Sequence, residues 1–238
     1  RPGAGAGRGA GDDEMSRAGL TSETVFHTWD DYYIPGTSVL RNKFTTPEKP
    51  YGETDRSVLR ILETAATAFR LTEMARRPIL SRFDYDHMKA IHRYIFQDVY
   101  EWAGKERVGP TGGFITKSGH AYYDAGPHLS LAANAEYERL ASKNLLRGLE
   151  LQEFVEELAE SWSTLNLIHS FREGNTRSQL VFFTRLANQA GYWIDTSKFT
   201  LTSPLRDEFV QARFHSQDTG DIDPLVAVLR RVVKPTSR

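Results

Sequence analysis

Cysteine is absent from the 238 residues of the chain, which excludes disulfide bonds and thiolate metal sites. This absence fits a reducing compartment. The sequence also lacks any apolar run of the roughly 18–20 residues that a membrane-spanning helix needs, and it begins with no signal-peptide pattern. We therefore expect a cytoplasmic protein that does not associate with a membrane.

An excess of charge of either sign is lacking as well. The chain has 30 Lys and Arg against 31 Asp and Glu, a formal net charge of −1. This balance argues against direct nucleic-acid binding through electrostatic attraction. Residues 1–20 are rich in Gly, Ala and Arg without periodicity and are predicted to form a flexible N-terminal tail. Residues 21–235 are predicted to form one domain, because a hydrophobic content of 39% suffices for a sizeable core.

Helical periodicity dominates the rest of the chain, which predicts an all-α fold. Apolar residues recur at steps of three and four within residues 54–74, 84–99, 129–146, 154–168, 180–190, 205–215 and 223–233. In the first of these helices, the predicted apolar face includes Val58, Ile61 and Phe69. Aromatic residues before it, among them Trp29 and Tyr32, are expected to pin an N-terminal arm to the core. Residues 109–127 break the helical pattern and predict a small β-hairpin.

Residues 169–177, between two predicted helices, read His-Ser-Phe-Arg-Glu-Gly-Asn-Thr-Arg. Gly174 and Asn175 both tolerate left-handed backbone angles, which lets successive N–H groups form a concave nest. The next helix begins directly after them, so its first N–H groups lack internal partners and favour an anion. Arg177, in the first turn, can add a charge-assisted fork to a phosphate. The loop is therefore a candidate phosphate site.

Two further side chains of this loop indicate group transfer. A phosphate would repel Glu173 unless a cation lay between them, an arrangement that suits Mg²⁺. His169 ends the preceding helix and could take the proton from a hydroxyl that attacks phosphorus. Together these residues predict metal-assisted phosphoryl or nucleotidyl transfer. The alternative is a helix cap with surface ion pairs and no chemistry.

The order His-x-Phe-x-Glu-Gly-Asn-x-Arg resembles the signature of the Fic family, His-x-Phe-x-(Asp/Glu)-Gly-Asn-(Gly/Lys)-Arg-x-x-Arg. This resemblance, which extends to bacterial toxin-type members, implies a Fic-type helical bundle with a small β-hairpin flap. It implies a protein adenylyltransferase that moves AMP from ATP to a hydroxyl side chain of a target protein. The roles it implies are His169 as general base, Glu173 as the Mg²⁺ ligand, and Gly174, Asn175, Thr176 and Arg177 as nucleotide-binding residues.

The same resemblance assigns the predicted hairpin to the flap that binds the target. An exposed strand edge can hold an extended peptide through main-chain hydrogen bonds. An ordinary surface hairpin is the alternative. The target-binding residues expected there are Thr116, Lys117, Ser118, Gly119 and Tyr122.

Two positions depart from the signature. Thr176 stands where glycine is usual, a change that keeps the backbone N–H. Leu180 stands at the second arginine, which in the family holds the γ-phosphate of ATP, and losing such a contact costs about 1–3 kcal/mol. Arg185 lies about 500° further round the helix and is not an obvious substitute. A Fic-related transferase of another nucleotide or phosphate group, and a weakly active nucleotide-binding interaction module, therefore remain alternatives.

Self-inhibited members carry an inhibitory helix with the pattern (Ser/Thr)-x-x-x-Glu-(Gly/Asn). In this sequence a glutamate is followed by Gly or Asn only at Glu173, and the residue four positions earlier is His169. The pattern is therefore absent. We expect any inhibition of this kind to come in trans from a small antitoxin-like protein.

Overall fold

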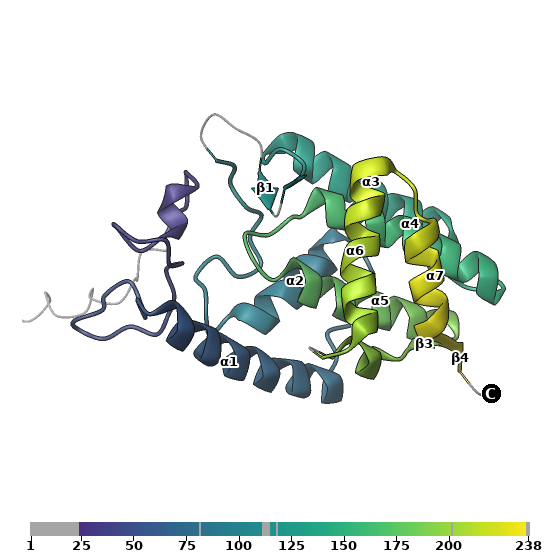
Figure 1. Ribbon diagram of the computed structural model, residues 1–238, viewed down its shortest axis with the longest axis horizontal. Helices are drawn as coiled ribbons and strands as arrows, with labels where there is room; N and C mark the ends of the chain where they lie inside the picture. Colours follow the sequence, from purple (N-terminus) through teal and green to yellow (C-terminus); the bar gives the residue numbers. More distant parts are fainter. Residues whose placement is uncertain (1–23, 81, 111–114, 118, 201, 237–238) are drawn as a thin grey trace, which may run out of the picture.

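The computed structural model describes residues 24–80, 82–110, 115–117, 119–200 and 202–236. The chain is mostly helical with two small sheets (Figure 1), which confirms the predicted all-α fold with a β-hairpin. The predicted tail at residues 1–20 lies outside the described residues. No helix in the described part of the chain is long and apolar enough to cross a membrane.

Each segment with helical periodicity contains a helix. The helices are α1 (Arg56–Arg76), α2 (Tyr85–Phe96), α3 (Pro127–Ser142), α4 (Leu151–Ile168), α5 (Asn175–Ala190), α6 (Pro204–Thr219) and α7 (Asp223–Val232). Short 3₁₀ turns lie at Asp30–Tyr32, Asn144–Leu146 and Thr196–Phe199.

Helix α4 forms the centre of the bundle and contacts α3, α5, α6 and α7. Most of its large apolar side chains are buried, as a helix that is apolar on several sides requires. Trp162 stacks on Phe183 of α5 at 4.5 Å between ring centroids and meets Phe209 of α6 edge-on at 5.1 Å. The end of α4 and the start of α5 are therefore held against the core from several directions.

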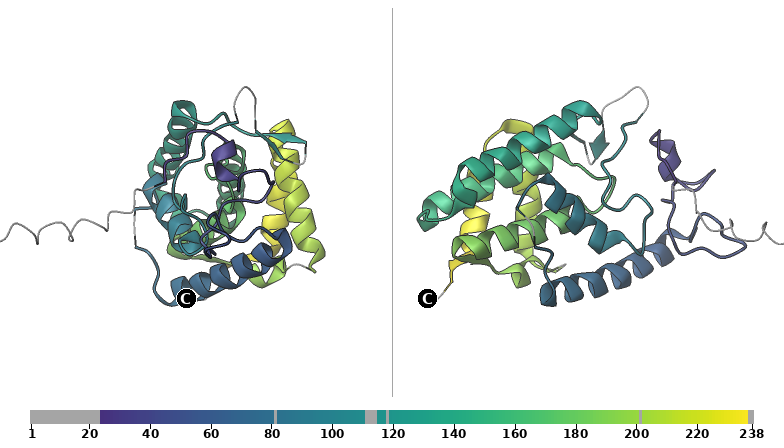
Figure 2. Two further views of the ribbon diagram at one scale, coloured as in Figure 1. Left: turned by 90° about the vertical axis from the view of Figure 1, so that its left-hand side faces the viewer. Right: turned by 180° about the vertical axis from the view of Figure 1, so that it is seen from behind.

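Helix α1 lies along the outside of the bundle, next to α2 (Figures 1 and 2). The prediction of its buried face was partly wrong, because Ile61 and Phe69 are 69% and 62% exposed. The side that faces the bundle instead carries Leu59, Thr67 and Met74. A helix at the edge of a bundle buries only one narrow stripe, so periodicity alone could not select the face.

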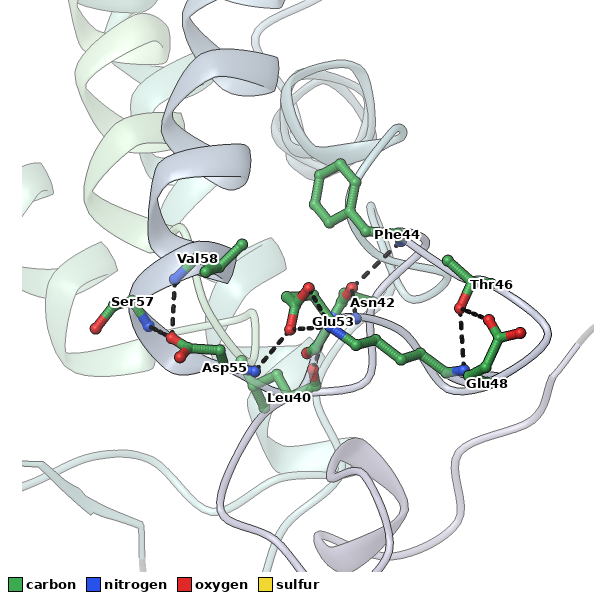
Figure 3. Close-up of polar contacts among 10 residues, drawn as sticks. Leu40, Asn42, Phe44, Thr46, Glu48, Glu53, Asp55, Ser57 and Val58 are labelled. Atoms are coloured by element: carbon green, nitrogen blue, oxygen red, sulfur yellow. Dashed lines mark hydrogen bonds and ion pairs between the residues drawn. The ribbon is translucent and has the colours of Figure 1, made fainter.

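An N-terminal arm precedes α1 and is tied to it by polar contacts. The Asn42 side chain donates to the carbonyls of Leu40 (2.9 Å) and Glu53 (3.0 Å) and accepts from the N–H groups of Glu53 and Phe44 (Figure 3). Asp55 caps α1 by accepting from the first backbone N–H groups of the helix. Earlier in the arm, aromatic stacking buries Tyr32 as predicted.

Two short sheets complete the fold. Strands β1 (Thr116–Lys117) and β2 (His120–Ala121) form the predicted antiparallel hairpin. The hairpin is fastened to α6, because the His120 ring stacks on Phe214 at 3.8 Å and its Nδ1 lies 2.8 Å from a carboxylate oxygen of Asp218. Strands β3 (Tyr192–Ile194) and β4 (Val233–Pro235) pair antiparallel near the C-terminus. The sequence patterns did not predict this second sheet.

Candidate active site

The loop between α4 and α5 begins at His169, which lies next to Tyr122, the residue after the hairpin. His169 is the C-cap of α4, with left-handed angles φ 51° and ψ 59°, a region that few non-glycine residues adopt. The ring centroid of Tyr122 lies 4.2 Å from that of the imidazole, and Tyr122 is 6% exposed. Tyr122, which directly follows β2, therefore packs against the imidazole of the predicted general base.

Asn175 shapes this loop with its side chain. Its Oδ1 accepts from the Phe171 N–H at 3.0 Å, and its Nδ2 donates to the Phe171 carbonyl at 2.7 Å. The side chain is buried and committed to the loop. Asn175 can therefore bind a nucleotide through its backbone N–H at the start of α5.

Gly174 is the N-cap of α5 and adopts φ 83° and ψ 4°. A Cβ at this position would lie 2.3 Å from ring atoms of Phe96, so the conformation and the close approach both require glycine. The first helical hydrogen bond runs from the Ser178 N–H to the Gly174 carbonyl at 3.1 Å. The N–H groups before it form the positive end of α5, as predicted for an anion site.

A buried histidine fixes the backbone of the predicted metal ligand. His92 Nδ1 accepts from the Gly104 N–H at 2.8 Å, so Nε2 carries the proton and donates to the Glu173 carbonyl at 2.9 Å. Burial lowers the pKa of His92 to about 3, which keeps the ring neutral. Sequence analysis gave His92 no role at the site, since its partners lie far away in the chain.

Glu173 lines a cavity of about 370 Å³, a size in the usual range for small-ligand pockets. The described residues hold no group of three or more His, Asp or Glu side chains placed to bind a metal. Mg²⁺ often takes one or two protein carboxylates and completes its coordination with phosphate oxygens and water, so one carboxylate beside a phosphate site fits this ion. The remaining residues of the wall are Tyr33, Ser38, Val39, Leu40, Arg56, Leu59, Arg60, Glu63, Tyr100 and Arg172.

Arg177 lies in the first turn of α5, as predicted, and a carboxylate of the same chain engages it. Its Nη2 pairs with Glu63 of α1, and its Nη1 donates to Thr67 Oγ1 at 3.2 Å. The guanidinium also lies over the Phe96 ring, 4.6 Å from the centroid. A phosphate bound at α5 would therefore compete with Glu63 for this arginine.

Sequence reasoning missed Arg107, which holds the end of α4. It is 2% exposed, and its Nε donates to the His169 carbonyl at 2.6 Å. Its Nη2 donates to the carbonyls of Ile168 and Tyr123, so it joins the loop to the segment after the hairpin. Burial lowers the pKa of Arg107 to about 10, still far above neutral. Its own sequence neighbourhood carried no signal of this role.

The remaining predicted residues lie around this centre. Thr176 is exposed on the first turn of α5. On the hairpin, Thr116 is exposed on β1, the backbone of Lys117 pairs with His120, and Gly119 turns with φ 86°. Ser118 lies outside the described residues.

Leu180, at the departure from the signature, is partly buried and lines a second cavity of about 690 Å³. Arg185 lines this cavity too, together with apolar side chains such as Leu71 and Met74. Neither Leu180 nor Arg185 belongs to the wall of the cavity that contains Glu173. Because leucine is uncharged, position 180 adds no charge to the candidate phosphate site.

Comparisons with known proteins agree with this arrangement. The profile of the Fic/DOC family matches residues 82–187. The probable protein adenylyltransferase y4lH of Sinorhizobium fredii is 36% identical over 208 residues, which are 86% of this chain and 96% of that protein. The protein adenylyltransferase VbhT of Bartonella schoenbuchensis is 36% identical over 204 residues, which are 85% of this chain but 38% of that longer protein.

Solved structures match over the same extent. The crystal structure of BepC, a VirB-translocated effector of Bartonella tribocorum with bound AMPPNP, has a TM-score of 0.76 against this chain. It shares 25% sequence identity, and the match covers 89% of this chain and 100% of that one. The helical bundle described above is thus also the fold of that nucleotide-bound protein.

Proposed function

Because the chain belongs to the Fic/DOC family, we propose that it transfers AMP from ATP to a hydroxyl side chain of a target protein. The chain is a nucleotidyltransferase, the class to which its curated relatives belong. Support for ATP as the substrate comes from the related structure that holds AMPPNP, an ATP analogue. The target hydroxyl and the roles of single residues rest on the site geometry.

The observation that carries the proposal is the contact of His169 with Tyr122, the residue after the hairpin, in the loop that leads to the N-terminus of α5. The target hydroxyl would lie at His169, which takes its proton as the oxygen attacks the α-phosphorus. A new oxygen–phosphorus bond forms, the bond from the α-phosphorus to the bridging oxygen breaks, and pyrophosphate leaves. The N–H group at Asn175 would hold a phosphate oxygen through the reaction, and that of Gly174, which donates to Glu173 Oε1 at 3.1 Å in this structure, would turn to the phosphate when the carboxylate binds Mg²⁺.

Glu173 is the residue that would hold Mg²⁺, which supplies neutralisation of the phosphate charge when bound. The His92 contact keeps the backbone of Glu173 in place before any ligand arrives. An extended segment of the target would pair with the hairpin edge, which lies next to Tyr122 and His169. Inhibition would come in trans from a small antitoxin-like protein, since the sequence lacks an inhibitory pattern of its own.

The test is label transfer to protein with Mg²⁺, comparing ATP labelled at the α-phosphate with ATP labelled at the γ-phosphate. We expect label from the α-position alone, with a loss of about 10²–10⁴-fold in His169→Ala. The matched control is His128→Ala, which changes an exposed histidine on α3 and should keep the activity. Transfer from the γ-position would instead indicate phosphoryl transfer, and no transfer from either position would refute the proposal.

A further inference from the structure

Helix α6 carries a buried arginine for which the described residues provide no carboxylate partner. Arg213 is 6% exposed. Its Nη1 donates to Asn166 Oδ1 and to Thr176 Oγ1, both at 3.2 Å, and its guanidinium lies over the Phe209 ring. Its Nε is buried with no hydrogen-bond partner among the described residues.

This environment is unfavourable for a cation. A buried guanidinium loses its hydration, and neutral oxygens and a ring face return only part of that free energy. Burial lowers the pKa of Arg213 to about 10, while Tyr122 raises it and Arg206 lowers it by smaller amounts. Arg213 therefore remains charged at neutral pH, and a bound anion would supply the opposite charge that the described residues do not provide.

The position of Arg213 indicates which anion would bind to it. Thr176 belongs to the first turn of α5, where backbone N–H groups lack helical partners. The guanidinium reaches this turn from α6, and Leu180 lies four residues after Thr176, on the same face of α5. Arg177, the arginine on the same turn, already pairs with Glu63. Arg213 is thus a cation at the first turn of α5 for which the described residues provide no carboxylate.

We propose that Arg213 binds the phosphate chain of the nucleotide at the N-terminus of α5 and supplies the guanidinium that α5 lacks at Leu180. The proposal rests on the proposed function, because the anion is the polyphosphate of the nucleotide substrate. It also gives Thr176 a role that glycine could not fill, since the threonine hydroxyl holds the guanidinium at the turn.

The experiment measures binding of AMPPNP and of inorganic tripolyphosphate, each with Mg²⁺, by calorimetry. Arg213→Met should lower the affinity for both ligands about 10- to 100-fold, which is the effect of losing one or two charge-assisted hydrogen bonds. Arg230→Met is the matched control, because it removes an exposed arginine from α7 and should leave both affinities unchanged. Arg213→Lys keeps the charge but lacks the paired N–H donors of the guanidinium, so its affinity for both ligands should lie between those of Arg213→Met and the wild type.

Thermal melting without ligand separates this role from a structural one. If Arg213 mainly joins α6 to α4 and α5, the Met variant should melt well below wild type and the Lys variant should not rescue binding. If it serves the phosphate, the Met variant should melt at or above wild type, because an apolar side chain replaces a buried cation that has no carboxylate partner. A lower melting temperature with no rescue by Lys would overturn the proposal.

The two ligands also separate this inference from the proposed function. Equal binding by wild type and Arg213→Met would overturn the inference and leave AMP transfer untouched. Weaker binding by the Met variant, in a protein that transfers no label, would support the inference and refute the transfer reaction. Failure of the wild type to bind either ligand would refute both.

Discussion

Gly174→Ala tests whether the start of α5 depends on the close approach of Gly174 to the Phe96 ring. The new Cβ would lie 2.3 Å from the Cε2 and Cζ atoms of Phe96. Phe96 cannot move aside easily, since it is fully buried and packs against His92 at 4.7 Å and Tyr100 at 6.1 Å between ring centroids. The substitution must therefore displace either the Phe96 ring or the turn that presents the N–H groups.

The cost has two parts. Placing alanine at φ 83° costs about 1–2 kcal/mol, and forcing a methyl group against a packed ring costs about 1–3 kcal/mol more. Gly191→Ala is the matched control, because Gly191 caps the other end of the same helix at φ 93° with nothing within 4 Å of its Cβ position. The control carries the conformational cost without the steric one.

Thermal unfolding and AMPPNP titration of both variants measure these parts. For a domain of this size, 1 kcal/mol lowers the melting temperature by about 2–4 °C, so Gly174→Ala should melt about 2–12 °C below Gly191→Ala. We expect AMPPNP binding to weaken only in the Gly174 variant. Equal melting temperatures together with intact binding in both variants would refute the argument that this turn requires glycine.

Two further predictions follow from contacts of the loop. Glu63→Gln removes the carboxylate that pairs with Arg177, so AMPPNP should bind about 2- to 5-fold tighter when its affinity is measured by calorimetry. Unchanged or weaker binding would show that Glu63 does not compete with the phosphate for Arg177. The pKa of His92 in the folded state is lowered from 6.5 to about 3. Between these pH values the unfolded chain binds a proton at His92 and the native state does not. The free energy of unfolding therefore falls by about 1.4 kcal/mol per pH unit as the pH drops from 6.5 towards 3. Glutamine does not titrate, so the melting temperature of His92→Gln should decline less than that of the wild type when the pH falls from 6.5 to 4. Equal declines in the two proteins would exclude His92 as the cause of the loss of stability.

The helices and the loop motif could be predicted because their signals are local. Periodicity found each helix, and the loop residues from His169 to Arg177 occupy one short segment whose turn and helix start follow from Gly174 and Asn175. The packing of those helices is not local. Ile61 on α1 was predicted to be buried but is exposed, because the position of a helix within a bundle depends on its neighbours and not on its own period.

The supports of the site could not be predicted for the same reason. Arg107 lies 62 residues from His169 along the chain, and His92 lies 81 residues from Glu173. Arg213 reaches Thr176 across 37 residues. An arginine or histidine within an amphipathic pattern looks the same whether it faces water or a backbone carbonyl, so only the folded arrangement distinguishes these three.

These distant contacts bear on what the motif can do by itself. Arg107 places a cation against the carbonyls at the C-terminal end of α4, where the helix dipole is negative, and His92 holds the carbonyl of Glu173. Both bonds fix backbone groups, so they would orient the proposed base and the proposed metal ligand without touching a substrate. A related chain that kept His169 and Glu173 but lost Arg107 or His92 would retain the signature while its loop could relax, and a displacement of about 1 Å can cost about 10²-fold in rate. The signature therefore identifies the family, whereas the activity of a given member depends on buried partners outside it.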